Sequence, residues 1–215
     1  MAFLLKYSNI KNMKKQVIVI HGGDSFDSHE EYLKFLKSFE IDREYFDGMK
    51  KKGWKATLDE ELGDGYEVVA PQMPCKGNAK YAEWKIWFDK LAPFFEDGVM
   101  LVGHSMGGIF LAKYLSETTL PKKITAVFLV AAPYDTGADF SLADFILPKS
   151  LEKFGKQVSK IFIYQSKDDS VVPFENGEKY KKDLPDAKLE MFNDKGHFNQ
   201  EKFPELVQEI KSLAN

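Results

Sequence analysis

Residues 101–108 read Leu-Val-Gly-His-Ser-Met-Gly-Gly and contain the pattern Gly-x-Ser-x-Gly centred on Ser105. The apolar run 99–102 leads into the pattern, and the segment 109–115 after it contains no glycine or proline. This context predicts a strand that turns sharply into a helix, with the serine at the turn. A chance Gly-Ser-Gly turn needs neither flanking element, so the context favours a serine placed for chemistry.

The two glycines of the pattern have a physical role at such a turn. The strand and the helix approach each other closely, and a Cβ atom at Gly103 or Gly107 would clash with the neighbouring strand and helix. Ser105 is then expected above the sheet edge as a nucleophile, with its hydroxyl exposed. The amide of Met106 would lie at the helix N-terminus, where unpaired N–H groups and the helix dipole favour an oxyanion.

The composition indicates one ordinary globular domain, because 44% of the 215 residues are hydrophobic and 29% are charged. The net charge of −3 gives the chain as a whole no attraction for nucleic acid or an anionic membrane. No apolar run approaches the ~20 residues that span a bilayer, and 1–6 are too short in apolar content for a signal peptide. Cys75 is the only cysteine, which fits a reducing compartment. A cytoplasmic protein is expected, with 1–6 as a tail or an edge addition.

Apolar runs of strand length alternate with segments of helical periodicity along the chain. Continuous β-branched runs are typical of strands buried on both faces, which predicts a doubly wound, mostly parallel α/β sheet flanked by helices. Residues 1–215 are expected to form a single domain. Strands are expected at 16–20, 67–70, 99–102, 126–131, 161–164 and 189–192, the last at an edge; helices are expected after the capping box Ser28-His29-Glu30-Glu31, from Trp54 to Leu62 before Gly63, over 78–95, after Ser105, from Pro173 and over 204–213.

The segment 25–53 is longer than a connection from a strand to a helix needs, and it is expected to be a lid-like insertion. It leaves the sheet directly after the first strand, so it would lie over the catalytic edge as a minimal or small cap. The alternative is a satellite core under a surface helix. The aromatic residues that would form an apolar pocket wall are Phe26, Phe35, Phe39, Tyr45 and Phe46.

A serine hydroxyl needs a base within hydrogen-bond reach and a third group that orients the base. Of the four histidines, His104 precedes Ser105 and its side chain is expected to point away. His21 follows the first strand, where a structural hydrogen bond is expected, and His29 stands exposed at a helix entrance. His197 lies in the loop after the last strand, and it is the remaining histidine that can reach the serine.

An acid that orients the base is expected after the strand 161–164, and both Asp168 and Asp169 follow it. The chain order serine, aspartate, histidine is that of the α/β-hydrolase arrangement. Position after the strand does not choose between the two aspartates, because adjacent residues in a turn point in different directions.

A second oxyanion donor is expected in the turn after the first strand, at the amide of Gly23, with Asp24 as the alternative. No metal or cofactor is expected, because the chain has one cysteine, no paired histidines at ligand spacing and no phosphate-binding glycine loop. Cys75 follows a strand, but no histidine is placed to activate it, so an ordinary loop thiol is favoured.

Five segments combine into a recognisable set: His21-Gly22-Gly23, Pro71-Gln72-Met73-Pro74 with Trp84 after it, Gly103-His104-Ser105-Met106-Gly107-Gly108, Asp169-Ser170-Val171-Val172-Pro173 and Gly196-His197-Phe198. Together they resemble α/β-hydrolases, and more narrowly the small serine hydrolases of the retinoblastoma-binding-protein and YdeN kind. The resemblance runs from about residue 16 onward, and the long stretch 25–53 departs from it. It implies Ser105 as the nucleophile, His197 as the base and Asp169, four residues before Pro173, as the acid.

The resemblance implies hydrolysis of carboxylic ester or related acyl bonds of a small substrate through an acyl-enzyme. The expected partner is therefore a small acyl compound rather than nucleic acid or a membrane. The competing interpretation is a protein-interaction module on a hydrolase fold with little turnover, because a fold does not fix a function.

Overall fold

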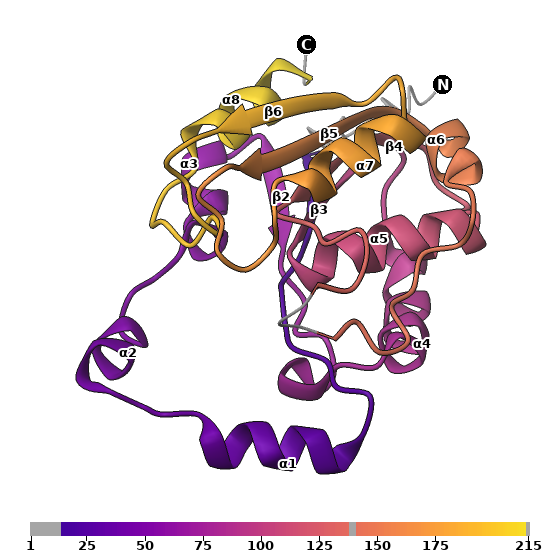
Figure 1. The fold of residues 1–215 in the computed structure, drawn as a ribbon. Coiled ribbons are helices and arrows are strands. Elements are labelled where there is room, and N and C mark those ends of the chain that lie inside the picture. The colour runs from indigo at the N-terminus through magenta and orange to yellow at the C-terminus, as the bar shows by residue number, and fades with distance from the viewer. Residues whose placement is uncertain (1–13, 138–140, 214–215) are drawn as a thin grey trace, which may run out of the picture.

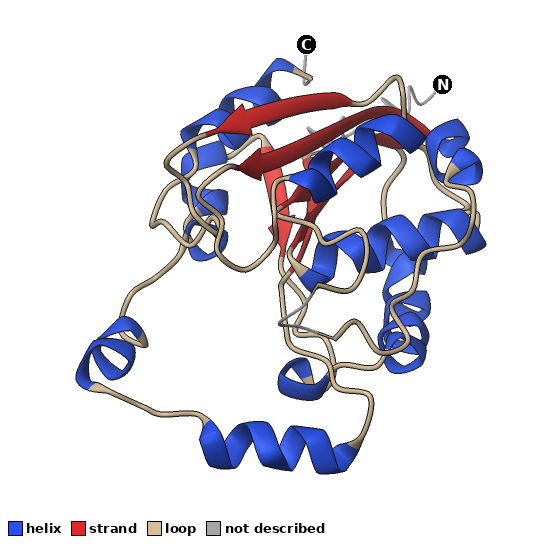
Figure 2. Ribbon diagram, viewed as in Figure 1, coloured by secondary structure: helices blue, strands red, loops and turns tan. Residues whose placement is uncertain are grey.

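A computed structural model describes residues 14–137 and 141–213. Within these ranges six strands form one sheet in the order β2-β1-β3-β4-β5-β6, and each neighbouring pair is parallel. The strands are β1 (Lys15–Ile20), β2 (Tyr66–Val69), β3 (Val99–His104), β4 (Ile124–Val130), β5 (Val158–Ser166) and β6 (Lys188–Phe192). Helices lie on both faces of the sheet (Figures 1 and 2), which confirms the predicted doubly wound α/β fold.

The helices divide into two groups, one on each face of the sheet. Successive side chains of a strand point to opposite faces, so Ile18 and Ile20 of β1 enter one core while Val17 and Val19 enter the other. The first core packs under α4 (Tyr81–Leu91), α5 (Met106–Glu117), α6 (Glu152–Gln157) and α7 (Glu175–Asp183); the second packs under the short 3₁₀ turn η1 (Trp54–Ala56), α3 (Leu58–Leu62) and α8 (Pro204–Ser212).

The sheet changes direction between β1 and β3. The chain goes outward from β1 to β2, returns past β1 to form β3, and then continues through β4 and β5 to the edge strand β6. At this switch point Ile20 pairs with Gly103, so the segments that follow β1 and β3 lie side by side. Ligands of open α/β sheets bind at such a point, outside the carboxyl ends of the strands.

The turn from β3 into α5 brings three backbone segments into contact. A Cβ atom on Gly103 would lie 2.5 Å from the carbonyl oxygen of Gly107 and 2.7 Å from Cα of Gly108. A Cβ atom on Gly107 would lie 2.7 Å from the carbonyl oxygen of His21 and still closer to that of Ile20. The predicted reason for both glycines is therefore confirmed, because neither position has room for a side chain.

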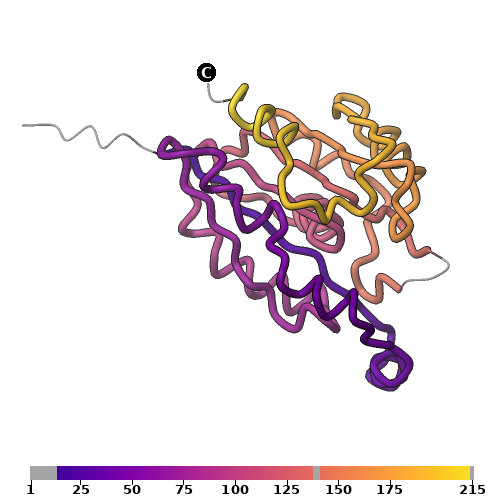
Figure 3. The backbone as a smooth tube through the Cα atoms, turned by 90° about the vertical axis from the view of Figure 1, so that its left-hand side faces the viewer, coloured from indigo at the N-terminus to yellow at the C-terminus, as the bar shows by residue number. Residues whose placement is uncertain are grey.

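An arm formed by residues 25–53 leaves the end of β1 and returns at η1 (Figures 1 and 3). It carries α1 (His29–Ser38) and α2 (Arg43–Gly48), and Ser28 caps α1 by accepting a hydrogen bond from the amide of Glu31, as the capping box predicts. Neither helix contains a buried residue, so the arm does not build a satellite core. The arm exposes the large apolar side chains Leu33, Leu36, Phe39, Ile41, Tyr45, Phe46 and Met49.

Some element boundaries differ from the sequence-based prediction. The helix expected over 78–95 begins at Tyr81, because the carboxylate of Asp144 accepts hydrogen bonds from the amides of Tyr81 and Ala82. A cap supplied by a residue 63 positions away leaves no local signal. The 3₁₀ turn η2 (Lys76–Asn78) ends at the first residue of the predicted range. The end of that range forms a second 3₁₀ turn, η3 (Ala92–Phe94).

Two further differences concern the segment between β5 and α7. β5 continues to Ser166, past the predicted end at residue 164, because Gln165 and Ser166 pair with β6. Pro173 lies just before the helix rather than in its first turn, since α7 begins at Glu175. The prediction that residues 1–6 form a tail or an edge addition concerns residues outside the described ranges. Within the described ranges no helix has the length and apolar character needed to cross a membrane.

We predict that Gly107→Ala lowers the free energy of unfolding by about 3 kcal/mol or more, because the added methyl group meets backbone atoms that cannot move aside. Alanine has the better helix propensity, so a loss at this helical position isolates the steric clash. Gly65→Ala is the matched control, since nothing lies within 4 Å of its added Cβ atom, and a change of under about 1 kcal/mol is expected there. Urea unfolding of the two variants measures both values; equal stabilities would contradict the prediction.

Candidate active site

The backbone of Ser105 is strained. Its φ of 53° and ψ of −122° lie in a region that L-residues rarely adopt. Two hydrogen bonds hold it there: its amide donates to the carbonyl of Val130 at 2.8 Å, and its own carbonyl accepts from the amide of Gly108 at 2.8 Å. The structure therefore places the serine at the strained strand-to-helix turn that the sequence predicts.

The side chain of Ser105 is less accessible than the sequence suggested. The residue as a whole is only 9% exposed, so it is packed more closely than the sequence predicts. The reason is the turn after β1, which passes over the serine so closely that a Cβ atom on Gly22 would lie 3.0 Å from Cβ of Ser105. The turn after β1 therefore covers part of Ser105.

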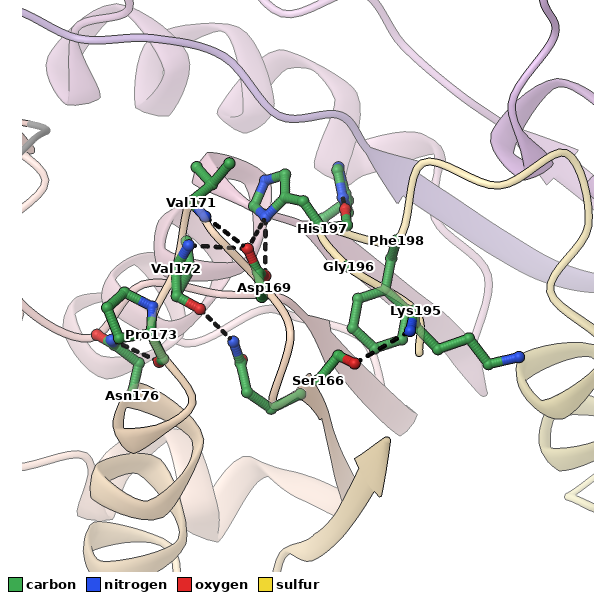
Figure 4. Close-up of polar contacts among 12 residues, drawn as sticks. Ser166, Asp169, Val171, Val172, Pro173, Asn176, Lys195, Gly196, His197 and Phe198 are labelled. Carbon is green, nitrogen blue, oxygen red and sulfur yellow. Dashed lines mark hydrogen bonds and ion pairs between the residues drawn. The ribbon is translucent and has the colours of Figure 1, made fainter. Parts of the chain in front are cut away.

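The side chains of Asp169 and His197 form a close pair after β5 and β6 (Figure 4). Nδ1 of His197 lies 3.0 Å from Oδ2 and 3.2 Å from Oδ1 of Asp169. Oδ1 also accepts hydrogen bonds from the amides of Val171 at 2.8 Å and Val172 at 3.0 Å. The carboxylate is fully buried and the histidine side chain is 12% exposed, so the pair has a fixed orientation with Nδ1 facing the acid.

Asp168 points away from the imidazole and serves the backbone instead. Its Oδ1 accepts from the hydroxyl of Ser166 at 2.5 Å and from the amide of Gly196 at 2.9 Å. The Ser166 hydroxyl, helped by the Gly196 amide, holds the pKa of Asp168 below its ordinary value. Asp168 therefore fixes the start of the loop that carries His197, and Asp169 is the aspartate that contacts the imidazole of His197.

Ser105 and His197 follow strands of the same parallel sheet, β3 and β6, at the edge where the strands end. No hydrogen bond joins them among the residues that the structure describes. Because Nδ1 of His197 is occupied by Asp169, Nε2 is the nitrogen left for the serine. Such contacts are often long in proteins without substrate and shorten when the substrate binds.

The amides of Gly23 and Met106 are the two predicted to bind an oxyanion. Neither has a protein acceptor within the described residues. The amide of Asp24, the alternative to Gly23, donates to the carbonyl of Lys76 at 2.8 Å and is therefore already occupied. Gly23 itself passes so close to the Lys76 carbonyl that a side chain there would collide with it.

His21 and His29 take the structural roles expected of them. Nδ1 of His21 donates to the carbonyl of Gly22 at 2.6 Å, and its Nε2 accepts from the amide of Met73 at 2.8 Å. Burial lowers the pKa of His21, which suits a neutral ring with one donor and one acceptor nitrogen. His29 is exposed at the start of α1.

The sequence predicts that the side chain of His104 points away from the site, but the structure places it next to His197. Its ring centroid lies 5.0 Å from that of His197, and its Nε2 is 2.8 Å from the main-chain carbonyl oxygen of His197. Nζ of Lys55 lies 3.4 Å from its Nδ1. Burial, with Lys55 nearby, lowers the pKa of His104 well below its ordinary value. No pattern in the sequence connects Lys55 with this site.

Two cavities lie on the surface of the described residues. A groove of about 850 Å³ is lined by α6 and by the starts of β5 and β6, at the edge of the sheet opposite Ser105. A pocket of about 380 Å³ lies where His29 and Tyr32 of α1 meet the loop from Cys75 to Asn78. Cys75 is an exposed free thiol, and the described residues contain no group of three or more metal-binding side chains.

The parallel sheet, the strained serine after β3 and the Asp–His pair after β5 and β6 define an α/β-hydrolase. The sequence pattern of the serine hydrolase family matches residues 45–213. The rat protein named serine hydrolase RBBP9 is 30% identical over 164 residues, which cover 75% of this chain and 84% of the rat protein. The chain therefore belongs to the serine hydrolase family.

Solved structures show the same fold. The ydeN gene product from B. subtilis has a TM-score of 0.73 and 20% identity, covering 94% of this chain and 99% of its own. A serine hydrolase involved in carbazole degradation, the CarC enzyme, has a TM-score of 0.61 and 16% identity, covering 93% of this chain and 90% of its own. The family match begins at residue 45, so α1 and most of the arm lie outside it.

We predict that Asp169→Asn lowers kcat for a short-chain p-nitrophenyl ester by roughly 10²–10⁴, because an amide no longer favours the productive tautomer of His197. Asp168→Asn is the matched control. Its amide oxygen still accepts from Ser166 and Gly196, so a loss of under about tenfold is expected. Steady-state kinetics on both purified variants give the comparison, and the reverse order would move the acid to Asp168.

Proposed function

We propose that this serine hydrolase cleaves carboxylic ester or related acyl bonds of a small substrate through an acyl-enzyme. The observation that carries the proposal is the Asp169–His197 pair at the same sheet edge as the strained Ser105. A base held by a buried carboxylate beside a serine at a strand-to-helix turn is the arrangement that activates a hydroxyl.

In the first step His197 Nε2 takes the hydroxyl proton of Ser105 while Oγ attacks the acyl carbon of the substrate. The carbonyl oxygen becomes an oxyanion and accepts hydrogen bonds from the amides of Met106 and Gly23, for which the described part of the chain offers no other acceptor. The tetrahedral intermediate then expels the alcohol, which leaves with the proton held by His197. Ser105 retains the acyl group as an ester.

In the second step water attacks the acyl carbon and gives a proton to His197. The intermediate collapses, Ser105 Oγ leaves and recovers its proton from the imidazole, and the carboxylic acid is released. Throughout, Asp169 accepts from Nδ1 and stabilises the imidazolium, while its amide contacts from Val171 and Val172 keep the carboxylate aligned.

The arm is the proposed source of substrate selectivity, as a lid-like cap at the catalytic edge. Its start is tied to two loops: the carbonyl of Asp24, just before the arm, accepts from the amide of Ala79 after β2 at 2.7 Å, and Asp27 accepts from the hydroxyl of Ser141 after β4 at 3.0 Å. Its aromatic rings contact one another in series, with centroids 5.1 Å apart for Phe26–Phe35 and 5.3 Å for Phe35–Phe39. An apolar acyl chain is the ligand that such a wall would favour.

The exposed apolar residues of the arm also favour a second candidate, an interaction module that binds another protein through α1 and α2. This candidate needs no turnover and no reactive serine. Labelling by a fluorophosphonate separates the two, because the probe forms a covalent bond only with an activated serine.

We predict that wild-type protein reacts stoichiometrically with a fluorophosphonate and that Ser105→Ala abolishes both labelling and ester hydrolysis. Loss of a nucleophile costs on the order of 10⁴–10⁶ in rate. Ser116→Ala, on the same helix and bonded only to the carbonyl of Ala112, is the control and keeps full activity. Mass spectrometry of the labelled peptide and ester kinetics give the readout; activity within tenfold of wild type in Ser105→Ala would refute the proposal.

We predict that replacing residues 29–48 by a Gly-Ser linker of equal length changes the preference for ester chain length and leaves the labelling rate within about threefold. The replacement removes α1 and α2 but keeps two contacts at the ends of the arm: the carbonyl of Phe26 still accepts from Lys80, and the indole of Trp54 still donates to the carbonyl of Phe198. A panel of p-nitrophenyl esters with acyl chains of about two to twelve carbons measures the preference, because each added methylene group increases the apolar surface that the enzyme can bury. An unchanged profile would count against a lid-like role for the arm.

A further inference from the structure

The loop after β6 carries the proposed general base but has no regular secondary structure of its own. It receives hydrogen bonds from η1, the three-residue turn that follows the arm. Nε1 of Trp54 donates to the carbonyl of Phe198 at 2.8 Å, and the amide of Trp54 donates to the carbonyl of Gln200 at 3.0 Å. The next residue of η1, Lys55, approaches the same loop through His104.

We propose that Lys55 is a positioning residue for the general base, acting through His104 on the backbone of His197. The ammonium group of Lys55 donates to Nδ1 of His104, and Nε2–H of His104 donates to the carbonyl oxygen of His197. The proposal rests on the proposed function, because it assigns Lys55 to the histidine that activates Ser105.

The direction of these hydrogen bonds follows from the groups involved. A carbonyl oxygen only accepts, so the proton of neutral His104 must be on Nε2. Nδ1 of His104 then carries a lone pair, and an ammonium group, which only donates, is the partner that matches it. With Lys55 charged, the other tautomer of His104 would place a proton against the ammonium and a lone pair against the carbonyl. The two contacts therefore select one tautomer together.

The surroundings of Lys55 fit a role in the site better than a role in stability. Among the described residues no carboxylate pairs with its ammonium group, which lies 4.8 Å from the centroid of the Trp54 ring. Burial lowers the pKa of Lys55 to about 8. Two other titratable groups, His21 and His197, act on His104, and the cation of Lys76 acts on His21. Holding a cation here without a counter-charge is unfavourable for folding.

Loss of the ammonium should therefore act on turnover rather than on substrate binding. Lys55→Met keeps the length of the side chain and its apolar packing but leaves Nδ1 of His104 without a donor. We expect kcat to fall about tenfold, since small displacements of a catalytic group are costly, while KM stays within about twofold. Lys55→Arg supplies a cationic donor again and should restore most of kcat. Lys52→Met is the control, because Lys52 is an exposed lysine of the same segment.

A second measurement reads the contact without using activity. Long-range ¹H–¹⁵N spectra of the imidazole groups distinguish a proton on Nε2 from one on Nδ1, and we expect wild-type His104 to carry it on Nε2. In Lys55→Met a mixture of tautomers, or exchange between them, is expected; in Lys55→Arg and Lys52→Met the wild-type signal is expected. Thermal unfolding of each variant shows whether a loss of kcat reflects a loss of folded protein.

Several outcomes would overturn the proposal. One is an Nδ1–H tautomer in the wild-type protein, which holds whether or not any variant folds. Another is unchanged kcat and unchanged tautomer in Lys55→Met; a third is a raised KM with unchanged kcat, which would place Lys55 against the substrate. If Ser105 is labelled and essential while Lys55→Met behaves as wild type, only this proposal fails. If wild-type protein neither labels nor turns over, the proposed function fails, and the tautomer still reports the contact.

Discussion

The carboxyl end of β1 and the first turn of α5 pass so closely that no side chain fits between them, and the site depends on this contact. It requires glycine at residue 107, and the matching approach of β3 to α5 requires glycine at residue 103. With both sides closed, the chain can leave β3 for α5 only through a strained backbone at Ser105. The same packing places the turn after β1, which contains Gly22 and Gly23, beside the serine.

The opposite half of the site is built differently. The loop of His197 follows the edge strand β6, where a single neighbouring strand gives little support, and its position is set by side chains from distant segments. Asp168 holds its start, Asp169 holds the imidazole, and η1 holds the residues after the histidine. The serine is thus positioned by backbone packing and the histidine by directed hydrogen bonds, which are more sensitive to single substitutions.

Much of the fold could be predicted because local sequence patterns indicate where its strands and helices lie. Apolar runs and helical periodicity located the six strands of the described sheet, and the capping box located the start of α1. The prediction failed where a distant residue decides a boundary, as at α4, whose first amides are capped by Asp144. It also failed for the accessibility of Ser105, which depends on a turn more than eighty positions earlier in the chain. Because the chain advances about 1.5–3.3 Å per residue, positions so far apart meet only through the tertiary fold.

The sequence by itself determined the parallel sheet, the glycines of the serine turn and the order serine, aspartate, histidine, because strand period, steric demand and chain order are properties of neighbouring residues. Chain position left Asp168 and Asp169 open, and only the family resemblance indicated Asp169. The tertiary structure shows that Asp169 faces the imidazole, how closely Ser105 is packed, and that Lys55 and His104 lie against the loop of His197. These contacts join residues 28, 49 and 93 positions apart in the chain. The physical reason is that the direction of a loop side chain is set by the partners that the fold brings to it, and no local pattern records those partners.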